Sequence, residues 1–258
     1  MPLKKNGAPR SGTLSPNQTF GRFRTAANRY GSRLNRPALR DWFMGRPVVF
    51  FDFDNTITPF DVFDDMVARF SQDDRWVALE GRWVKGEIGS RQCLKGQLEG
   101  VKAEKSVLLN YLAGIPIEPY FKKIVAFLRK KGIKVFILSD NFDFFLKRIL
   151  KRHGITKVPV YCNRARFIKK GFSPSFPYVS KKCPTCAHCK TKNLLANTMR
   201  DSIIFFIGDG RSDICPAKKA DVVFAKGKLL EFCRKERIPH LAHRNLKQVY
   251  DYFKRSLK

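Results

Sequence analysis

Val48-Val49-Phe50-Phe51-Asp52-Phe53-Asp54-Asn55-Thr56-Ile57-Thr58 is an apolar run that ends abruptly in two carboxylates and two hydroxyls. A run this rich in Val and Phe is typical of a strand buried on both faces, as in a parallel sheet. Asp52 and Asp54 then lie at the carboxyl end of the strand, where open α/β sheets bind ligands. Because a charge buried there without a partner is unfavourable, the pattern predicts a bound cation, a phosphate, or both.

Two later segments repeat this arrangement. Residues 133–138 are predicted to form a strand leading into Ser139-Asp140-Asn141, and residues 203–207 a strand leading into Gly208-Asp209-Gly210-Arg211-Ser212-Asp213. Amphipathic helical segments alternate with these strands, which is the pattern of right-handed βαβ units. Short strands are also expected at 158–161 and 222–224, whereas 163–184 is expected to be irregular. The predicted fold class is α/β, with a doubly wound parallel sheet.

Residues 60–116 contain no convincing strand, and their apolar residues recur at helical spacing. A helical stretch of this length between two strands cannot belong to the sheet, so it is predicted to form a small cap. The expected domains are a basic arm at 1–46, a helical cap at 60–116, and an α/β core formed by 47–59 and 117–258.

The composition is that of a globular protein, with 258 residues, 43% hydrophobic residues and 23 Phe. No apolar run approaches the roughly 20 residues that span a bilayer, and the N-terminus lacks the apolar segment of a secretory signal. Seven Cys, an odd number, also fit a reducing compartment better than a secreted, disulfide-bonded protein. We therefore expect a cytoplasmic protein that does not bind membranes.

The first 46 residues carry ten Lys or Arg and one acid, Asp41. This composition predicts a basic, disordered arm, with a short helix at 37–44 packed on the core. An Arg-rich, acid-poor segment is also typical of organelle transit peptides, so organelle targeting stays open.

The formal net charge of +29 favours anionic partners, among them nucleic acid and phosphorylated small molecules. However, Lys and Arg are spread along the whole chain, and no recognisable nucleic-acid-binding motif accompanies them. Nucleic acid is therefore kept as an alternative partner, and the oligomeric state is left open.

The sequence resembles the haloacid dehalogenase superfamily of phosphohydrolases. The likeness rests on four elements in order, namely D-F-D-N-T at 52–56, Ser139 after the second strand, a Lys, and G-D-G-R-S-D at 208–213. It covers about residues 47 to 257 and implies a Rossmann-like core. A helical insertion after the first strand is the cap of phosphoserine-phosphatase-like members.

The resemblance implies a role for each polar residue that follows the first strand. Asp52 would be the nucleophile that becomes an aspartyl phosphate, and Asp54 the general acid toward the leaving oxygen and then the base toward water. The backbone carbonyl of Asp54 would also bind the metal, and Thr56 would steady the loop. Asp61 lies where phosphoserine phosphatases carry a Glu that meets the substrate ammonium, and its shorter side chain argues against phosphoserine.

Ser139 matches the motif whose hydroxyl and following backbone amides, here including that of Asp140, hold the phosphoryl group. Phosphoserine phosphatases usually have Gly-Gly after this Ser. Here Asp140-Asn141 resembles the phosphoethanolamine/phosphocholine phosphatases, while Phe142-Asp143-Phe144-Phe145 resembles the methionine-salvage hydroxy-keto-methylthiopentenyl-phosphate phosphatases.

The last two motifs would complete the site. Asp209 would bind Mg²⁺ together with Asp52, and Asp213 would join the metal site or orient a metal-bound water or the Lys. Few hard carboxylate oxygens, with positions left for water and phosphate, suit Mg²⁺ better than Zn²⁺. The phosphate-binding Lys is expected to be Lys190, directly after Cys189, with Lys192 as the alternative.

Cys183, Cys186 and Cys189 are spaced C-x₂-C-x₂-C, which offers three soft ligands without an obvious fourth. Structural zinc and reduced, packed thiols both stay open for this cluster.

The function expected is Mg²⁺-dependent hydrolysis of a small phosphomonoester, a phosphorylated metabolite, through an aspartyl-phosphate intermediate. Candidate substrates are the methionine-salvage enol phosphate, phosphoethanolamine or phosphocholine, and phosphoserine. The alternatives are a basic RNA- or anion-binding protein that keeps the fold without turnover, and a phosphotransferase.

Overall fold

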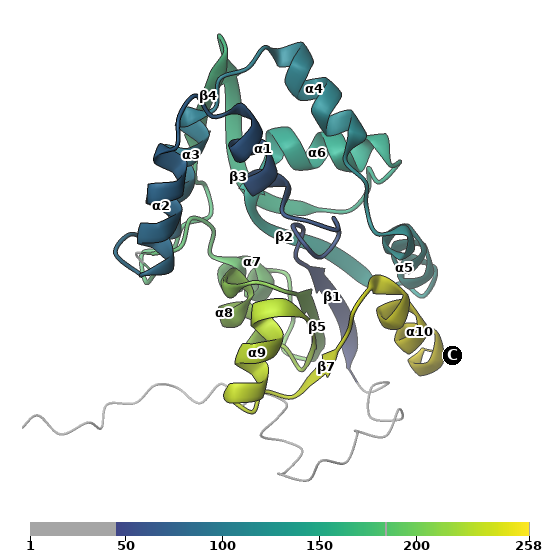
Figure 1. The fold of residues 1–258 in the computed structure, drawn as a ribbon. Helices are drawn as coiled ribbons and strands as arrows, with labels where there is room; N and C mark the ends of the chain where they lie inside the picture. Colours follow the sequence, from purple (N-terminus) through teal and green to yellow (C-terminus); the bar gives the residue numbers. More distant parts are fainter. Residues whose placement is uncertain (1–44, 184, 258) are drawn as a thin grey trace, which may run out of the picture.

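The computed structural model describes residues 45–183 and 185–257 (Figure 1). It contains a seven-stranded sheet in the order β4-β3-β2-β1-β5-β6-β7. All neighbouring strands run parallel except β3 and β4, which are antiparallel. The predicted α/β fold class is therefore confirmed. The strands are β1 (Arg46–Phe51), β2 (Lys134–Phe142), β3 (Val160–Ile168), β4 (Gly171–Ser175), β5 (Ser202–Gly208), β6 (Val222–Ala225) and β7 (His240–Ala242).

The first strand in the sequence lies at the centre of the sheet. β1 pairs with β2 on one side, where Val48 is opposite Lys134, and with β5 on the other, where Val48 is opposite Ile204. Its residues 48–51 are buried, as expected for a strand covered on both faces. The carboxyl ends of β1, β2 and β5 consequently meet at one edge of the sheet.

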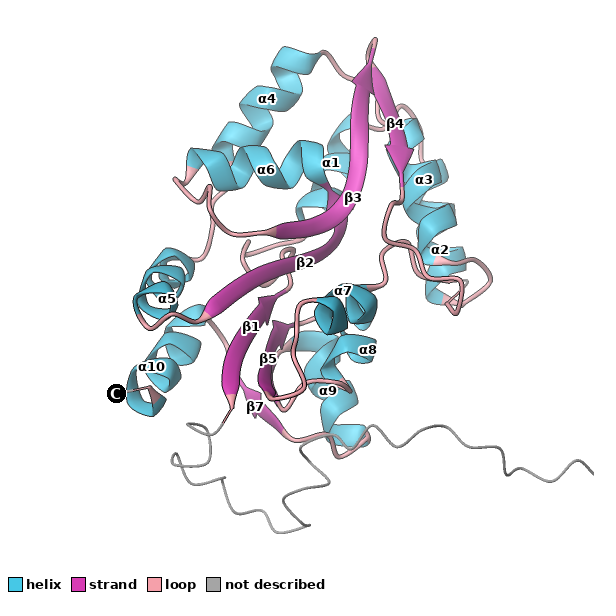
Figure 2. Cartoon of the chain, turned by 180° about the vertical axis from the view of Figure 1, so that it is seen from behind, coloured by secondary structure: helices cyan, strands magenta, loops and turns pink. Residues whose placement is uncertain are grey.

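Helices cover both faces of the sheet (Figures 1 and 2). On one face, α5 (Pro119–Lys130), α6 (Asp143–Arg152) and α10 (Leu246–Ser256) pack their apolar sides on a large cluster that includes Phe51 and Phe205. On the other face, α7 (Lys190–Ala196), α8 (Ile214–Ala217) and α9 (Gly227–Lys235) cover a smaller cluster around Phe50 and Phe206. A short 3₁₀ turn, η3 (Arg211–Asp213), precedes α8.

The insertion after β1 consists of α1 (Val62–Phe70), α2 (Arg75–Val84), α3 (Ser90–Gly100) and α4 (Lys105–Gly114). Its two ends are joined where the amide of Glu118 donates to the carbonyl of Ile57 at 2.7 Å. Buried residues of α1, α3 and α4 belong to the same hydrophobic cluster as the sheet. α2, in contrast, buries none of its side chains. The helical content expected for 60–116 is thus present, and the division into cap and core remains a proposal.

Residues 163–184 are not irregular throughout, which corrects the sequence-based expectation. β3 runs on to Ile168 and turns at Lys169, whose φ is +47°, into the antiparallel strand β4 (Figure 2). Ala165 and Phe167 pack toward the apolar cluster, while Arg164 and Arg166 are exposed. The sequence did not predict this hairpin because the strand contains arginines and its turn contains no Gly or Asn.

Several predictions fall on residues 1–44, including the basic arm and its short helix, and these lie outside the described residues. Within the described ranges, no helix has the length and apolar character needed to cross a membrane.

Candidate active site

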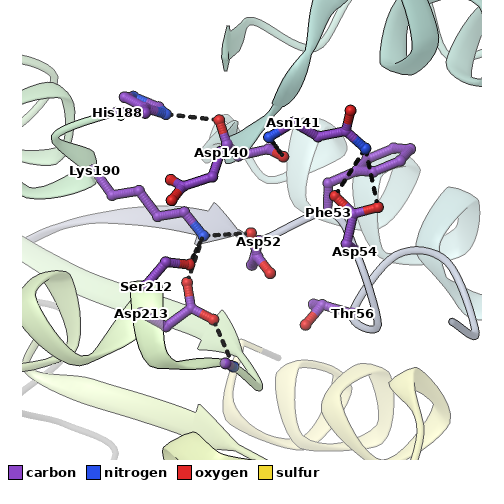
Figure 3. Close-up of polar contacts among 12 residues, drawn as sticks. Asp52, Phe53, Asp54, Thr56, Asp140, Asn141, His188, Lys190, Ser212 and Asp213 are labelled. Carbon is purple, nitrogen blue, oxygen red and sulfur yellow. Dashed lines mark hydrogen bonds and ion pairs between the residues drawn. The ribbon is translucent and has the colours of Figure 1, made fainter. Parts of the chain in front are cut away.

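The site is built around a buried lysine that bridges two aspartates (Figure 3). Lys190, the first residue of α7, places its Nζ 2.5 Å from Oδ1 of Asp52, at the end of β1, and 2.7 Å from Oδ1 of Asp213. The same ammonium donates to the Ser212 hydroxyl at 2.9 Å. Lys190 is 3% exposed, and Lys192 is exposed at the surface. Of the two candidate lysines, the structure therefore brings Lys190 to Asp52.

The charges of this cluster act on one another strongly because water is excluded. Burial alone lowers the pKa of Lys190, but the carboxylates of Asp213, Asp52 and Asp140 outweigh it, so that the pKa lies well above its usual value. Burial and the negative charges of Asp213 and Asp209 raise the pKa of Asp52, and Lys190 opposes them. The ammonium is thus permanently charged and offsets the repulsion between the two acids.

Asp213 also shapes the loop after β5. Its Oδ2 accepts hydrogen bonds from the backbone amides of Asp209 and Gly210, each at 3.0 Å, while its Oδ1 accepts from Lys190. A Cβ at Gly208 would lie 2.5 Å from Oδ2 of Asp213, so only glycine lets this carboxylate approach the loop. Because both of its oxygens are occupied and it is fully buried, Asp213 positions Lys190 and the loop that carries Asp209.

Asp54 is held beside Asp52 in a different environment. Both of its oxygens accept from the side-chain amide of Asn141 at 3.1 Å, and Oδ1 also accepts from the amide of Val62 at 3.0 Å. Burial, reinforced by the negative charge of Asp61, raises the pKa of Asp54 well above its usual value, against the hydrogen bonds from Asn141 and Val62. A carboxyl group of this kind retains a proton that it can donate.

The carboxylates offer a site that fits a magnesium ion. Among the residues that the structure describes, Asp52, Asp209 and Asp213 alone form a set of three whose ligand atoms lie within 4.8 Å of one another. Asp209 is oriented by the hydroxyl of Thr56, which donates to its Oδ1 at 3.0 Å. Because Asp213 already accepts hydrogen bonds on both oxygens, the carboxylates of Asp52 and Asp209 are left as donors, and carboxylate oxygens are the type that Mg²⁺ prefers.

The remaining predicted residues lie around this centre. Ser139 is 1% exposed, and its Oγ accepts from the amide of Asn141 at 3.0 Å. Asp140 directs its carboxylate to the Lys190 side of the site, as Figure 3 shows, and Oδ1 finds no hydrogen-bond partner in the described part of the chain. Burial raises the pKa of Asp140 to about 6. Asp61 is the N-cap of α1, where it accepts from the amide of Asp64 at 2.9 Å.

Three acidic residues of the insertion and its N-cap, Asp61, Asp64 and Glu80, interact electrostatically near Asp54. Asp64 is exposed at the surface, but its partial enclosure by neighbouring atoms and the charges of Asp61 and Glu80 still raise its pKa. Asp61 and Asp64 both raise the pKa of Asp54. Glu80 in α2 accepts from Gln97 at 3.3 Å. These acids therefore lie together on the Asp54 side of the site.

Sequence reasoning missed three residues of the site. Asn141 was read only as part of a family signature, and Ser212 as an unnamed position of the last motif. His188 was given no role, yet it is 2% exposed, its Nδ1 lies 2.7 Å from the carbonyl oxygen of Ser139, and its Nε2 lies 2.6 Å from the side-chain amide nitrogen of Asn193. Burial lowers the pKa of His188 to about 4, so the ring is neutral. The only signal in the sequence was its position two residues before Lys190.

Comparison with known proteins agrees with this geometry. The family described as Putative Phosphatase matches residues 47–236. The chain belongs to this phosphatase family.

The relatives of the chain include bacterial enzymes. The chain is 28% identical over 219 residues to the 2-hydroxy-3-keto-5-methylthiopentenyl-1-phosphate phosphatase of Bacillus pumilus, covering 82% of this chain and 94% of that enzyme. It is also 28% identical over 211 residues to the bifunctional enzyme MtnB/MtnX of Bacillus licheniformis, covering 80% of this chain but only 49%, about half, of that longer protein.

A solved structure of a phosphatase has a similar fold. The phosphoserine phosphatase of T. onnurineus superposes with a TM-score of 0.59 at 21% identity, over 86% of this chain and 98% of that one. The family match confirms the prediction of a phosphomonoester hydrolase, and the superposition confirms the fold expected from the resemblance to phosphoserine-phosphatase-like members of the haloacid dehalogenase superfamily.

Proposed function

We propose that this protein hydrolyses a small phosphomonoester through a phosphorylated Asp52, with Mg²⁺ bound by Asp52, Asp209 and the carbonyl of Asp54. The observation that carries the proposal is the Lys190 ammonium between Asp52 and Asp213. It fixes one oxygen of Asp52 and leaves the other without a side-chain donor among the described residues. We infer that this free oxygen attacks the phosphoryl group.

Each residue then has a task in the reaction. Lys190, the Ser139 hydroxyl and the amide of Asp140 bind the phosphoryl oxygens while Asp52 attacks phosphorus. Asp54 gives its proton to the leaving oxygen, and the resulting carboxylate accepts a proton from the water that hydrolyses the aspartyl phosphate. Bound Mg²⁺ supplies positive charge that offsets the repulsion between the anionic phosphate and the anionic nucleophile.

Asp54→Asn is expected to lower kcat by about 10²–10⁴-fold on an ester with a poor leaving group, because the amide cannot donate the proton. On p-nitrophenyl phosphate, whose leaving group needs no proton, the loss in formation of the phosphoenzyme should be smaller. Rapid-quench measurement of phosphoenzyme formation with both esters checks this. An equal loss in the rate of phosphoenzyme formation with both esters would show that Asp54 is not the general acid.

EDTA is expected to abolish turnover and Mg²⁺ to restore it. Mg²⁺ should also raise the melting temperature of the parent protein, since it binds only the folded site. Asp209→Asn should lose most of that shift, whereas Asp201→Asn, an exposed control after α7, should keep it. Full activity in EDTA, or activation by Zn²⁺ alone, would contradict a magnesium site made of these carboxylates.

For the substrate, the relatives favour the methylthiopentenyl enol phosphate named for them. A second candidate is favoured by the acids on the Asp54 side, Asp61, Asp64 and Glu80, in a protein with only 22 acids against 51 bases. Acids gathered where the leaving group must lie would attract a cationic leaving group, such as ethanolamine or choline. A panel of phosphomonoesters with Mg²⁺ separates the two candidates.

Asp64→Asn tests the second candidate. We expect KM for phosphoethanolamine and phosphocholine to rise about tenfold, equivalent to about 1.4 kcal/mol, with little change for an uncharged alkyl phosphate. Asp65→Asn is the matched control, because the adjacent Asp65 faces Arg69 and Tyr111 instead. If Asp64→Asn leaves KM for the cationic esters unchanged, these acidic residues do not bind the leaving group.

A further inference from the structure

The segment before α7 brings two cysteine thiols into contact. We call Cys183 together with residues 185–189 the cysteine loop. The Sγ atoms of Cys183 and Cys186 lie 3.1 Å apart, closer than two sulfur atoms in ordinary van der Waals contact. Both residues are partly exposed, as is Cys189, and Cys215 at the start of α8 is exposed. A reagent from solution can therefore reach this pair.

The two thiols are chemically unequal. Burial tends to raise the pKa of Cys183, but hydrogen bonds from Cys186 and Thr185 outweigh it and bring the pKa below its usual value. Burial and the adjacent Cys183 raise the pKa of Cys186 to about 12. One thiol is thus the better nucleophile, and its neighbour is a protonated thiol at contact distance.

Cys183 and Cys186 have no third metal-ligating side chain beside them among the described residues. Among the described residues, the set of three ligating side chains within 4.8 Å of one another contains only aspartates, so no third thiol joins Cys183 and Cys186 at that distance. Nor does either thiol contact Asp52, Lys190 or Asp213, whose hydrogen bonds are formed by other groups. Neither thiol has a role in the proposed hydrolysis.

We propose that Cys183 and Cys186 are an oxidation site, at which a peroxide converts the two thiols into a reversible disulfide. The Cys183 thiolate attacks one oxygen of the peroxide, the O–O bond breaks, and Cys183 becomes a sulfenic acid while hydroxide or alkoxide leaves and takes up a proton. The sulfur of Cys186 then attacks the sulfenic sulfur, the S–O bond breaks, and the thiol proton leaves with the hydroxide as water. A dithiol reductant restores both thiols and is itself oxidised to a disulfide.

The position of the cysteine loop gives this oxidation a structural readout. The hydroxyl of Ser90, at the start of α3, donates to the carbonyl of Thr185 at 3.2 Å and accepts from the amide of Ala187 at 2.8 Å. A Cβ at Gly89 would lie 2.7 Å from the same Thr185 carbonyl, so the insertion and the loop are in close contact.

The other end of the loop is fixed more firmly, by buried His188 on Ser139 and by Lys190 in the site. Closing the disulfide brings the two sulfurs to about 2 Å. The resulting movement therefore falls on Thr185 and Ala187 and loosens their contact with Ser90.

Mass spectrometry of the full-length chain tests the proposal. The protein is reduced, treated with hydrogen peroxide, alkylated with iodoacetamide and digested with trypsin, which releases residues 183–190 as one peptide containing three cysteines. We expect this peptide to lose two hydrogens and carry a single label, on Cys189. Hydrogen exchange at the amide of Ala187 should become about tenfold faster on oxidation and return to its original rate after treatment with a dithiol.

Two variants make the result specific. In Cys186→Ser, Cys183 should stop at the sulfenic acid, which dimedone traps, and the exchange rate of Ala187 should not change with peroxide. In Cys215→Ser, the nearby matched control, the disulfide should form as in the parent. The proposal is overturned if Cys183 pairs with Cys189 or Cys215, if peroxide leaves the peptide fully alkylated, or if the purified protein holds one zinc per chain that protects these thiols. None of these outcomes depends on the substrate or on turnover.

Discussion

Asp52→Asn is expected to lower turnover by about 10⁴-fold or more, because an amide oxygen cannot serve as the nucleophile toward phosphorus. The amide has nearly the shape of the carboxylate, and Lys190 keeps its bond to Asp213, so the fold should persist. Steady-state rates on the best ester of the panel, with circular dichroism and thermal melting, check both parts.

The variant should also fail to form an acid-stable, hydroxylamine-sensitive phosphoenzyme, which is the signature of an aspartyl phosphate. Asp65→Asn, a change of the same chemistry on α1, should retain both activity and phosphoenzyme. Parent-like turnover in Asp52→Asn would assign the nucleophile to another residue.

Lys190→Met is expected to remove activity and also to destabilise the protein by about 3–5 kcal/mol, since it leaves Asp52 and Asp213 buried without a counter-charge. Urea unfolding monitored by Trp fluorescence, together with the activity assay, measures the two effects. Lys192→Met is the matched control and should change neither, because Lys192 is exposed on the same helix.

A double variant separates the structural from the chemical part of this loss. Lys190→Met combined with Asp213→Asn removes one of the two unpaired charges, so it should recover part of the stability and none of the activity. A Lys190→Met protein as stable as the parent would mean that the buried acids take up protons readily or gain water.

The sequence predicted those parts of the fold in which local pattern and chemistry coincide. Asp52, Ser139 and Asp209 follow strands that are apolar on both faces, so their convergence at one edge follows from parallel pairing alone. Lys190 was less determined, because two lysines lie within three residues. Only the three-dimensional packing of α7 brings Lys190 to Asp52 and leaves Lys192 in solvent.

The rest of the site depends on contacts between segments that are distant in the sequence. A local sequence pattern does not predict such contacts. Asn141 holds Asp54 across 87 residues of chain, and His188 reaches the carbonyl of Ser139 across 49. The β3–β4 hairpin was missed for another reason, since its exposed arginines alternate with Ala165 and Phe167, and Phe167 stacks on Phe144 of the distant helix α6. Here the tertiary surroundings override local propensity.

The central position of β1 has a consequence for biosynthesis. Ribosomes make β1 before any of its neighbours, and its partners at Lys134 and Ile204 are added much later. During that interval, an apolar strand containing Phe50 and Phe51 has neither hydrogen-bonding edge paired, which is the condition that favours aggregation of nascent chains. Translation must therefore proceed beyond residue 208, the end of β5, before both edges of β1 can be paired.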